Sequence, residues 1–175
     1  MTFVNMHTKF RQECALNISK YADDDEWGGL SNNWLKKAFL NKYMYNYEFL
    51  GRPIIQLPSD MVQIQELIWQ TKPDLIIETG IAHGGSLIMS AAMLALLDLS
   101  EAIENGDSFD PKLSKRKVLG IDIDIRSHNH TEIENHPMSS RIEMIQGSSV
   151  SSNVLEQVND IARNYERIMV CLDSN

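Results

Sequence analysis

The pattern of apolar and polar positions changes along the chain and predicts a helical first part. Up to about residue 50, runs such as FRQECALNISKYA have apolar residues at helical spacing, and the acidic stretch DDDE interrupts them before Trp27. The run WLKKAFLNKYMYNYEFL is rich in aromatic residues and predicts a face that packs on the main domain or on a second subunit, with contact to a substrate as the alternative. We therefore expect a helical N-terminal extension, residues 1–58, before a main domain, residues 59–175.

A helix is predicted at the start of the main domain. The segment GRPIIQLPSD contains two prolines, and its last residues, Ser59 or Asp60, are suitable N-caps. Pro73 marks the end of the helix, because prolines often follow helix termini. The apolar residues that we expect on one face of this helix are Met61, Ile64, Leu67 and Ile68.

Beyond Pro73 the chain alternates between strand and helix patterns. Helical patterns begin at Ser86 and within SSNVLEQVNDIARNY, and a polar insertion, ENGDSFDPKLSKRK, precedes the second strand. This order predicts an α/β fold with a doubly wound, mostly parallel sheet. The continuous apolar runs, typical of parallel strands covered on both faces, are residues 75–79, 118–124, 141–147 and 166–173.

Composition and charge limit the classes of function. The 175 residues suffice for one domain with its own core, and 43% hydrophobic with 23% charged residues is ordinary for a soluble globular chain. A formal net charge of -8 argues against a nucleic-acid partner, which requires a clustered basic face. The basic cluster that we interpret as a solvated connection is Lys112, Lys115, Arg116 and Lys117.

The cysteines and the apolar runs indicate the compartment. Cys14 and Cys171 are far apart in sequence, and we expect Cys171 to be a buried reduced thiol, which fits a cytoplasmic protein. The N-terminus lacks the pattern of a secretory signal. The most apolar window runs from Ser86 to Leu99, about 14 residues, which is shorter than the ~20 residues of a membrane span. We therefore expect a buried helix there and no membrane span.

The segment IIETGIAHGGS, residues 76–86, is the strongest candidate for a binding site. In doubly wound sheets, ligands bind beyond the carboxyl ends of the strands, and here the first strand ends close to the acid Glu78. Gly80 can adopt backbone angles that are closed to other residues, and Gly84 and Gly85 allow the main chain to approach a ligand closely. The pattern predicts a turn that receives a nucleoside-containing cofactor.

The details of this turn favour S-adenosylmethionine over a dinucleotide. Ser86 can cap the following helix, whose first N–H groups remain free to meet a ligand. The spacing E-x-G-x-x-x-G-G-S differs from the dinucleotide fingerprint G-x-G-x-x-G. The charge of Glu78 would repel a diphosphate and attract a cofactor that carries an ammonium and a sulfonium. The alternative is a glycine turn that serves only the packing of strand and helix.

The ends of the second and third strands carry further candidates. GIDID places Asp122 and Asp124 where a carboxylate can accept hydrogen bonds from both ribose hydroxyls, and we favour Asp122 over Asp124. Period two places both aspartates on one face of a strand, unless Asp124 already lies in the loop. The alternative is a pair of surface aspartates that close the strand. Ser148, in QGSS at 146–149, lies where a loop could line the adenine.

Taken together, these segments resemble a known family. The runs LGRPIIQLPSD, PDLIIETGIAHGGSLI, GIDIDIRSHN, IQGSS and LDSN are similar, in this order, to the cephalosporin hydroxylase and rhamnosyl O-methyltransferase family. The resemblance extends from about Leu50 to the last residue. It implies a Rossmann-like class I methyltransferase fold, S-adenosylmethionine as methyl donor, and O-methylation of a sugar, a glycolipid or a secondary metabolite.

The resemblance also implies roles for individual residues. It assigns the cofactor to the glycine turn with Glu78 and Ser86, and to Asp122. It makes Asp173, in LDSN, a ligand of a divalent metal, with Mg²⁺ as the expected ion. Such a metal would lower the pKa of a substrate hydroxyl and fix it for attack on the methyl group. Without the family, Asp173 could be a helix N-cap or a loop acid.

Four histidines need an interpretation. His83, in the glycine turn, is a candidate to contact the cofactor or to act as a base near neutral pH, and the alternative is a histidine that only packs in the loop. A zinc site at His128, His130 and His136 is a weak hypothesis, because H-x-H in a polar segment without a nearby cysteine has little specificity.

The matched pattern stops at Asn175, whereas the family continues with further strands and an acidic pair that helps to hold the metal. We therefore expect a truncated or split piece of a methyltransferase, in which RIMVCL is an exposed apolar edge that pairs with other chains or with copies of itself.

Two other classes of function compete. An NAD-dependent oxidoreductase would share the sheet, but this turn lacks its fingerprint. A non-catalytic fragment would bind the cofactor weakly or only associate with partner chains. The acceptor is inferred by analogy alone, as a sugar hydroxyl on a cell-envelope glycolipid or polysaccharide.

Overall fold

The structure is a computed structural model in which residues 4–173 are described. Contacts within the chain divide it into two compact units, one up to Tyr43 and one from Met44 onward. The predicted extension also includes residues 1–3, and LDSN also includes residues 174–175, which lie outside the described part.

The first unit consists of two helices, α1 (Val4–Tyr21) and α2 (Asp25–Leu40). The acidic run between them explains the break, because the Asp24 carboxylate accepts a 2.8 Å hydrogen bond from the Trp27 amide and so forms the N-cap of α2. Tyr21 stacks on Trp27 across this junction, with ring centroids 5.4 Å apart. The predicted helical character of this part is confirmed.

A short 3₁₀ turn, η1 (Tyr43–Tyr45), spans the division between the units, and the second unit continues with a hairpin that the sequence pattern did not predict. Its antiparallel strands are β1 (Tyr47–Phe49) and β2 (Arg52–Ile54). The hairpin contacts the long helix α4 (Gly85–Asn105), and Ile54 is buried. The division after Tyr43 therefore differs from the boundary predicted after residue 58, because the hairpin packs with the sheet domain.

Helix α3 (Pro58–Thr71) begins earlier than predicted. Its N-cap is Leu57, so Ser59 lies in the first turn and does not cap the helix. Pro58 takes the first helical position, where its missing N–H costs nothing. Ile68 is buried and Ile64 packs against the core, but Leu67 is exposed, so the predicted apolar face is only partly correct.

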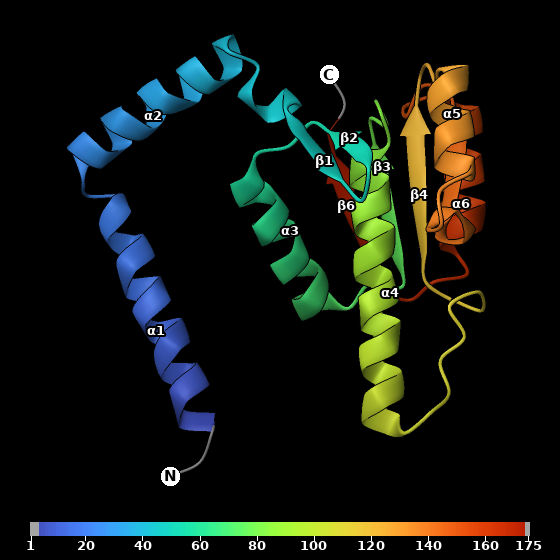
Figure 1. Cartoon of the computed structure of the whole chain (residues 1–175), viewed down its shortest axis with the longest axis horizontal. Helices are drawn as coiled ribbons and strands as arrows, with labels where there is room; N and C mark the ends of the chain where they lie inside the picture. Colours follow the sequence, from blue (N-terminus) through green and yellow to red (C-terminus); the bar gives the residue numbers. More distant parts are fainter. Residues whose placement is uncertain (1–3, 174–175) are drawn as a thin grey trace. The chain divides into compact units, whose positions relative to one another are not determined.

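Four parallel strands form the central sheet, and all four were predicted from the apolar runs. Their order is β5-β4-β3-β6, in which β3 pairs with both β4 and β6. Figure 1 labels three of these strands, β3, β4 and β6. The observed bounds are β3 Leu75–Thr79, β4 Lys117–Asp122, β5 Ile142–Gln146 and β6 Ile168–Leu172.

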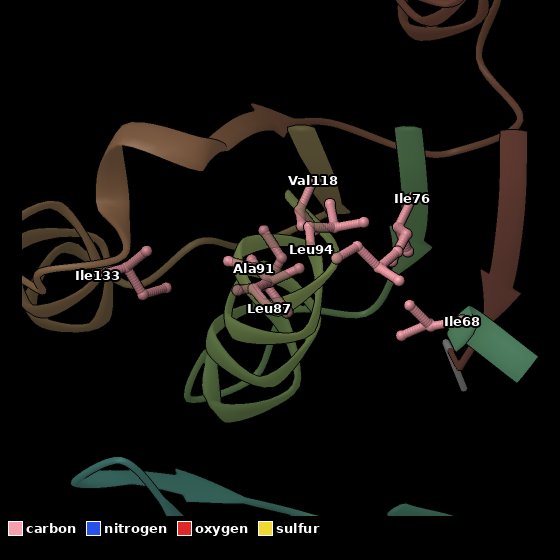
Figure 2. Close-up of a cluster of buried hydrophobic side chains, with 9 residues drawn as sticks. Ile68, Ile76, Leu87, Ala91, Leu94, Val118 and Ile133 are labelled. Carbon is pink, nitrogen blue, oxygen red and sulfur yellow. The ribbon is translucent and has the colours of Figure 1, made fainter. Parts of the chain in front are cut away.

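Helices cover both faces of this sheet. On one face, Ile76 of β3 and Val118 of β4 pack against α4, together with Ile68 of α3 and Ile133 of α5 (Ser127–Glu134), as Figure 2 shows. A short 3₁₀ turn, η2 (Ser139–Arg141), leads into β5. On the other face, α6 (Ser152–Ala162) covers a second cluster that includes Leu75, Leu119 and Ile145. The predicted doubly wound α/β fold is confirmed.

Helix α4 is longer than the apolar window in the sequence. Among the described residues it has the length and mean hydropathy of a membrane span, but half of that stretch is buried inside the fold. Leu87, Ala91 and Leu94 lie in the hydrophobic core. This packing supports the interpretation of α4 as a core helix.

The basic cluster is not a fully solvated connection, because Arg116 is buried. Its guanidinium forms ion pairs with Asp98 at 2.5 Å and with Glu101 at 2.8 Å, both on α4. Asp98 also pairs at 2.5 Å with the buried Arg141. These pairs fix the second half of α4 to the segments that precede β4 and β5.

Candidate functional site

A cavity of about 260 Å³ opens at the carboxyl ends of β3 and β6, on the side covered by α3 and α4. This is the position at which ligands bind in open α/β sheets. Three carboxylates contribute to its wall. The lining residues are Gln56, Asp60, Ile64, Glu78, Ser86, Met89, Ser90, Cys171, Leu172 and Asp173.

Glu78 is the most deeply placed acid in this wall. It lies in β3 with only 3% of its surface exposed, and the Ser86 hydroxyl donates a hydrogen bond to its Oε1 atom. Ser86 is therefore not the N-cap of α4. The cap is Gly84, whose φ of 83° is in the left-handed region, and it provides no side-chain bond to the first turn.

Burial raises the pKa of Glu78 from its ordinary value of 4.5 to about 7. The hydrogen bond from Ser86 opposes this change, and the negative charge of Asp173 adds to it. A carboxyl group with this pKa accepts a cation readily, because a positive charge nearby restores its ionised form.

Asp173 follows β6 directly and lines the same cavity, and its amide donates a 3.1 Å hydrogen bond to the Thr79 carbonyl oxygen. Its Oδ2 atom accepts a 2.8 Å hydrogen bond from Nε2 of Gln56. Partial burial raises the pKa of Asp173, the Gln56 bond lowers it, and the charge of Asp60 raises it. Burial and the charges of Glu78 and Asp173 also raise the pKa of the Cys171 thiol to about 11. The cavity thus disfavours anions and suits a cationic ligand.

The glycine turn has the left-handed backbone angles that its sequence predicts, and close packing explains why two of its positions are glycine. Gly80 and Gly84 have φ values of 93° and 83°, which only glycine adopts readily. A Cβ atom on Gly84 would lie 2.4 Å from Cδ1 of Ile133, and one on Gly85 would lie 2.3 Å from the carbonyl oxygen of Pro53. Close packing therefore accounts for these two glycines, and their approach to a ligand stays a prediction.

Asp122, at the end of β4, faces the glycine turn. Its Oδ2 atom accepts hydrogen bonds from the amides of Ile81 at 2.7 Å and Ala82 at 3.3 Å, and its Oδ1 atom accepts one from the Asp124 amide at 3.1 Å. A carboxylate has about four acceptor sites, so Asp122 retains capacity for a ribose hydroxyl. Asp124 is exposed and lies in the loop beyond the strand, so the two aspartates do not share one strand face.

The third strand end lies beside the second. The Gly147 amide donates a 2.8 Å hydrogen bond to the Asp122 carbonyl oxygen, which holds the loop with Ser148 next to β4. Ser148 is half-buried, and its carbonyl oxygen accepts a bond from the Ser151 amide at the start of α6. The predicted contact of Ser148 with adenine stays a prediction.

The structure brings together three of the predicted residues, Glu78, Ser86 and Asp173, around one cavity. His83 is half-buried in the turn and does not line that cavity. The sequence interpretation missed Gln56 and Asp60. Both lie in the run LGRPIIQLPSD, which belongs to the matched segments, but no spacing rule connects this run to a residue more than a hundred positions later.

The described residues contain no group of three or more potential metal ligands. Asp173 with its partner Gln56, and Asp60 nearby, could contribute one or two carboxylates to Mg²⁺, but they do not form a complete site. The proposed zinc cluster is not present in this part of the chain either. His130 pairs with Glu134 at 3.1 Å, and His136 bonds to the Leu50 carbonyl oxygen at 3.1 Å.

Three solved structures are similar to this chain, and the first of them superposes well enough to show the same fold. A structure titled "cmcI-D160 Mg-SAM" superposes with a TM-score of 0.51 and 18% identity, covering 75% of this chain and 47% of that one. A structure titled "cmcI-N160 SAH" gives 0.48 and 17%, with coverages of 75% and 54%. An O-methyltransferase from Bacillus cereus in complex with SAH gives 0.40 and 17%, with coverages of 83% and 55%.

The chain therefore spans about half the length of the solved relatives that it matches. No curated protein sequence matches it. The family description "Rhamnosyl O-methyltransferase/CmcI" matches residues 41–175, which include the hairpin, the whole sheet and every residue of the cavity wall. The chain belongs to the rhamnosyl O-methyltransferase/CmcI family.

Proposed function

We propose that this chain binds S-adenosylmethionine and takes part in methyl transfer to a hydroxyl group. The observation that carries the proposal is the acidic cavity at the carboxyl ends of β3 and β6. A buried glutamate with a pKa of about 7 lies there beside a glycine turn that leads into a helix N-terminus. A ligand with an ammonium and a sulfonium matches this charge, whereas a diphosphate does not.

The residues around the turn have distinct roles in this proposal. Glu78 provides the negative charge for the cationic part of the cofactor, and Ser86 fixes the direction of the Glu78 carboxylate. The first amides of α4, without carbonyl partners inside the helix, remain as donors. Asp122 accepts hydrogen bonds from the ribose, and Ser148 lies against the adenine. Gly80, Gly84 and Gly85 keep the turn compact, and Asp124 is the second candidate for the ribose.

The bound cofactor would supply an electrophilic methyl group, and the chain would position the acceptor and remove its proton. Asp173 is the candidate for this last task, because its raised pKa makes it a better base than an ordinary aspartate. His83 is the second candidate. The predicted assistance by Mg²⁺ would involve Asp173, but no step of the proposal depends on it.

The acceptor that we propose is a hydroxyl of a sugar, as part of a saccharide or glycolipid, or of a secondary metabolite. The family description supports O-methylation. A cytoplasmic location fits a cofactor that is made and used inside cells, and it stays part of the proposal.

Calorimetric titration of the purified chain with S-adenosylmethionine and S-adenosylhomocysteine tests the cofactor. We expect saturable binding of both, and no binding of NADH. Glu78→Gln should weaken the binding of S-adenosylmethionine, with Glu66→Gln on the exposed side of α3 as the matched control. Binding of NADH alone would contradict the proposal.

A second candidate function is association without catalysis, which the exposed apolar side chains of β6 favour. Ile168, Val170 and Leu172 lie beside Leu75, Ile77 and Thr79 of β3, on the sheet face that α6 packs on, but they remain exposed at this edge. Transfer of a labelled methyl group from S-adenosylmethionine to a panel of saccharides separates the two candidates. Transfer supports the enzyme, and binding without transfer to any acceptor supports association.

A further inference from the structure

Two residues outside the cavity hold the glycine turn in place. Arg52 lies in β2 of the hairpin, and Asn129 lies in α5. These elements approach the turn from separate parts of the chain, since Arg52 precedes the turn and Asn129 follows β4. Neither residue belongs to a glycine motif or to the cavity wall.

The turn contains a backbone conformation that needs external support. Ala82 has a φ of 46°, in the left-handed region, where a residue with a Cβ atom costs on the order of 1 kcal/mol. Ala82 is also exposed, so burial of its own side chain does not offset this cost. Such a conformation persists only where the surroundings determine it.

Hydrogen bonds to four backbone groups around Ala82 provide that support. On the amide side, Asp122 accepts bonds from Ile81 and Ala82. On the carbonyl side, Asn129 Nδ2 donates to the Ala82 oxygen at 2.8 Å. Arg52 donates to the His83 oxygen from Nη2 at 2.6 Å and from Nε at 3.1 Å. The two amides are thus fixed from β4, and the two carbonyls from β2 and α5.

The two supporting side chains are themselves connected and buried. Arg52 Nη2 also donates to Asn129 Oδ1 at 3.2 Å, so one network holds both carbonyls. Asn129 is 3% exposed, and the Arg52 side chain is 11% exposed. Arg52 touches Glu132 only at 3.5 Å, and the Glu132 side chain is 63% exposed. The network is therefore directed at the turn rather than at the surface.

We propose that Arg52 and Asn129 are positioning residues that hold the turn Gly80–Gly85 in the conformation that receives the cofactor. This inference rests on the proposed function. The cofactor meets a turn whose geometry is already set, so binding does not have to order it. Loss of either side chain leaves a strained turn with unpaired carbonyls, and the turn then samples other conformations.

The test combines S-adenosylhomocysteine titration with amide hydrogen exchange of the turn, on the same variants. Arg52→Met and Asn129→Leu should each weaken binding by about tenfold and speed exchange at Ile81 and Ala82. The double variant should resemble the single ones, because one network is lost in each case. Glu132→Gln, at the exposed end of the network, should match the wild type in both measurements.

Two conservative variants separate positioning from general stability. Asn129→Asp keeps the acceptor for Arg52 but removes the donor to Ala82, so we expect weak binding without loss of fold. Arg52→Lys keeps one charged donor and should retain part of the affinity. All affinities are measured well below each variant's melting temperature, where a purely structural defect leaves them unchanged.

The outcomes are distinguishable. If the wild type binds the cofactor and the Arg52 and Asn129 variants bind it with the same affinity, the positioning role is overturned and the proposed function stands. The same holds for weaker binding without faster exchange of the turn. A wild-type chain that binds neither S-adenosylmethionine nor S-adenosylhomocysteine would overturn the proposed function and the positioning role with it.

Discussion

Glu78 shows how a single residue combines a stability cost with a function. Its carboxyl group is buried, and it accepts a hydrogen bond from the Ser86 hydroxyl. A buried carboxyl whose pKa rises from 4.5 to about 7 destabilises the fold when it is ionised. A cation bound beside Glu78 would compensate the buried negative charge, and we interpret the loss of stability as a consequence of this binding role.

The first prediction concerns the pH dependence that follows from Glu78. Because its pKa is raised in the folded state, the stability it contributes is complete below pH 4.5 and is lost as pH rises through about 7. The loss corresponds to about 3 kcal/mol. Glu78→Gln should remove this part of the pH dependence, measured by urea unfolding between pH 4 and pH 8. Parallel curves for the wild type and the variant would contradict the assignment.

The binding of S-adenosylmethionine should have the opposite trend. Below pH 7 a proton competes with the cation for Glu78, so the affinity should be about tenfold stronger at pH 8 than at pH 6. Titrations at the two pH values measure this difference. In Glu78→Gln the affinity should be weak and independent of pH over this range. A wild-type affinity that becomes weaker as pH rises would exclude this role for Glu78.

Two left-handed glycines provide a matched comparison. Gly84 and Gly106 have φ values of 83° and 72°, but only Gly84 has a neighbour at its Cβ position, the Ile133 side chain. Gly106→Ala should cost about 1–2 kcal/mol from the backbone alone. Gly84→Ala should cost about 1–3 kcal/mol more, because Ile133 must move. Denaturant unfolding of both variants measures the difference, and equal losses would show that Ile133 yields freely.

At the scale of elements, α4 connects the carboxyl ends of the strands, where the glycine turn lies, with the segments that precede β4 and β5. Its N-terminus follows the glycine turn, and its second half carries Asp98, which bridges the buried Arg116 and Arg141. Burial alone would raise the pKa of Asp98, but hydrogen bonds from Arg141, Ser114 and Arg116 lower it below its ordinary value. The bridge thus depends on an ionised aspartate between two arginines.

Asp98→Asn should destabilise the chain by about 3–5 kcal/mol, because two buried arginines lose a shared partner. The wild-type contribution of Asp98 is present above its unfolded pKa and is lost as pH falls through the lower folded value. Asp160→Asn is the control, since its pair with Arg163 is exposed and should change stability by no more than about 0.5 kcal/mol. Thermal unfolding compares the two variants. A loss below 1 kcal/mol in Asp98→Asn would show that solvent replaces the bridge.

At the scale of the whole molecule, the sheet has an open edge. Within residues 4–173, β6 pairs only with β3, and three of its apolar side chains are exposed. Edge strands of this kind are templates for pairing with another chain. The prediction from the sequence that this run is an exposed apolar edge is thus confirmed for the described residues, whereas pairing through it has not been tested.

We expect the purified chain to associate in a concentration-dependent manner through β6. Val170→Lys, at the centre of the edge and 56% exposed, should shift the molecular mass measured by light scattering toward the monomer. Val62→Lys on α3, which is 57% exposed, is the matched control and should leave the mass unchanged. A monomeric wild type at all concentrations would contradict this expectation.

Much of this fold follows from local pattern. The four strands were predictable because a parallel strand that is covered on both faces has a continuous apolar run, and LIIET is fully buried as that rule requires. The hairpin and α5 were not predictable in this way. The hairpin strands have three residues each, and α5 is polar, so neither has enough periodic positions to distinguish it from a loop.

The sequence by itself determined the sheet domain, the position of the glycine turn at a strand end, and the acids Glu78 and Asp122 beside it. These features depend on neighbours along the chain. Tertiary structure alone decided that Gln56 bonds to Asp173, that Arg52 and Asn129 hold the turn, and that burial raises the pKa of Glu78. Each of these depends on residues far apart in sequence, whose distance and burial are set only when the helices pack on the sheet.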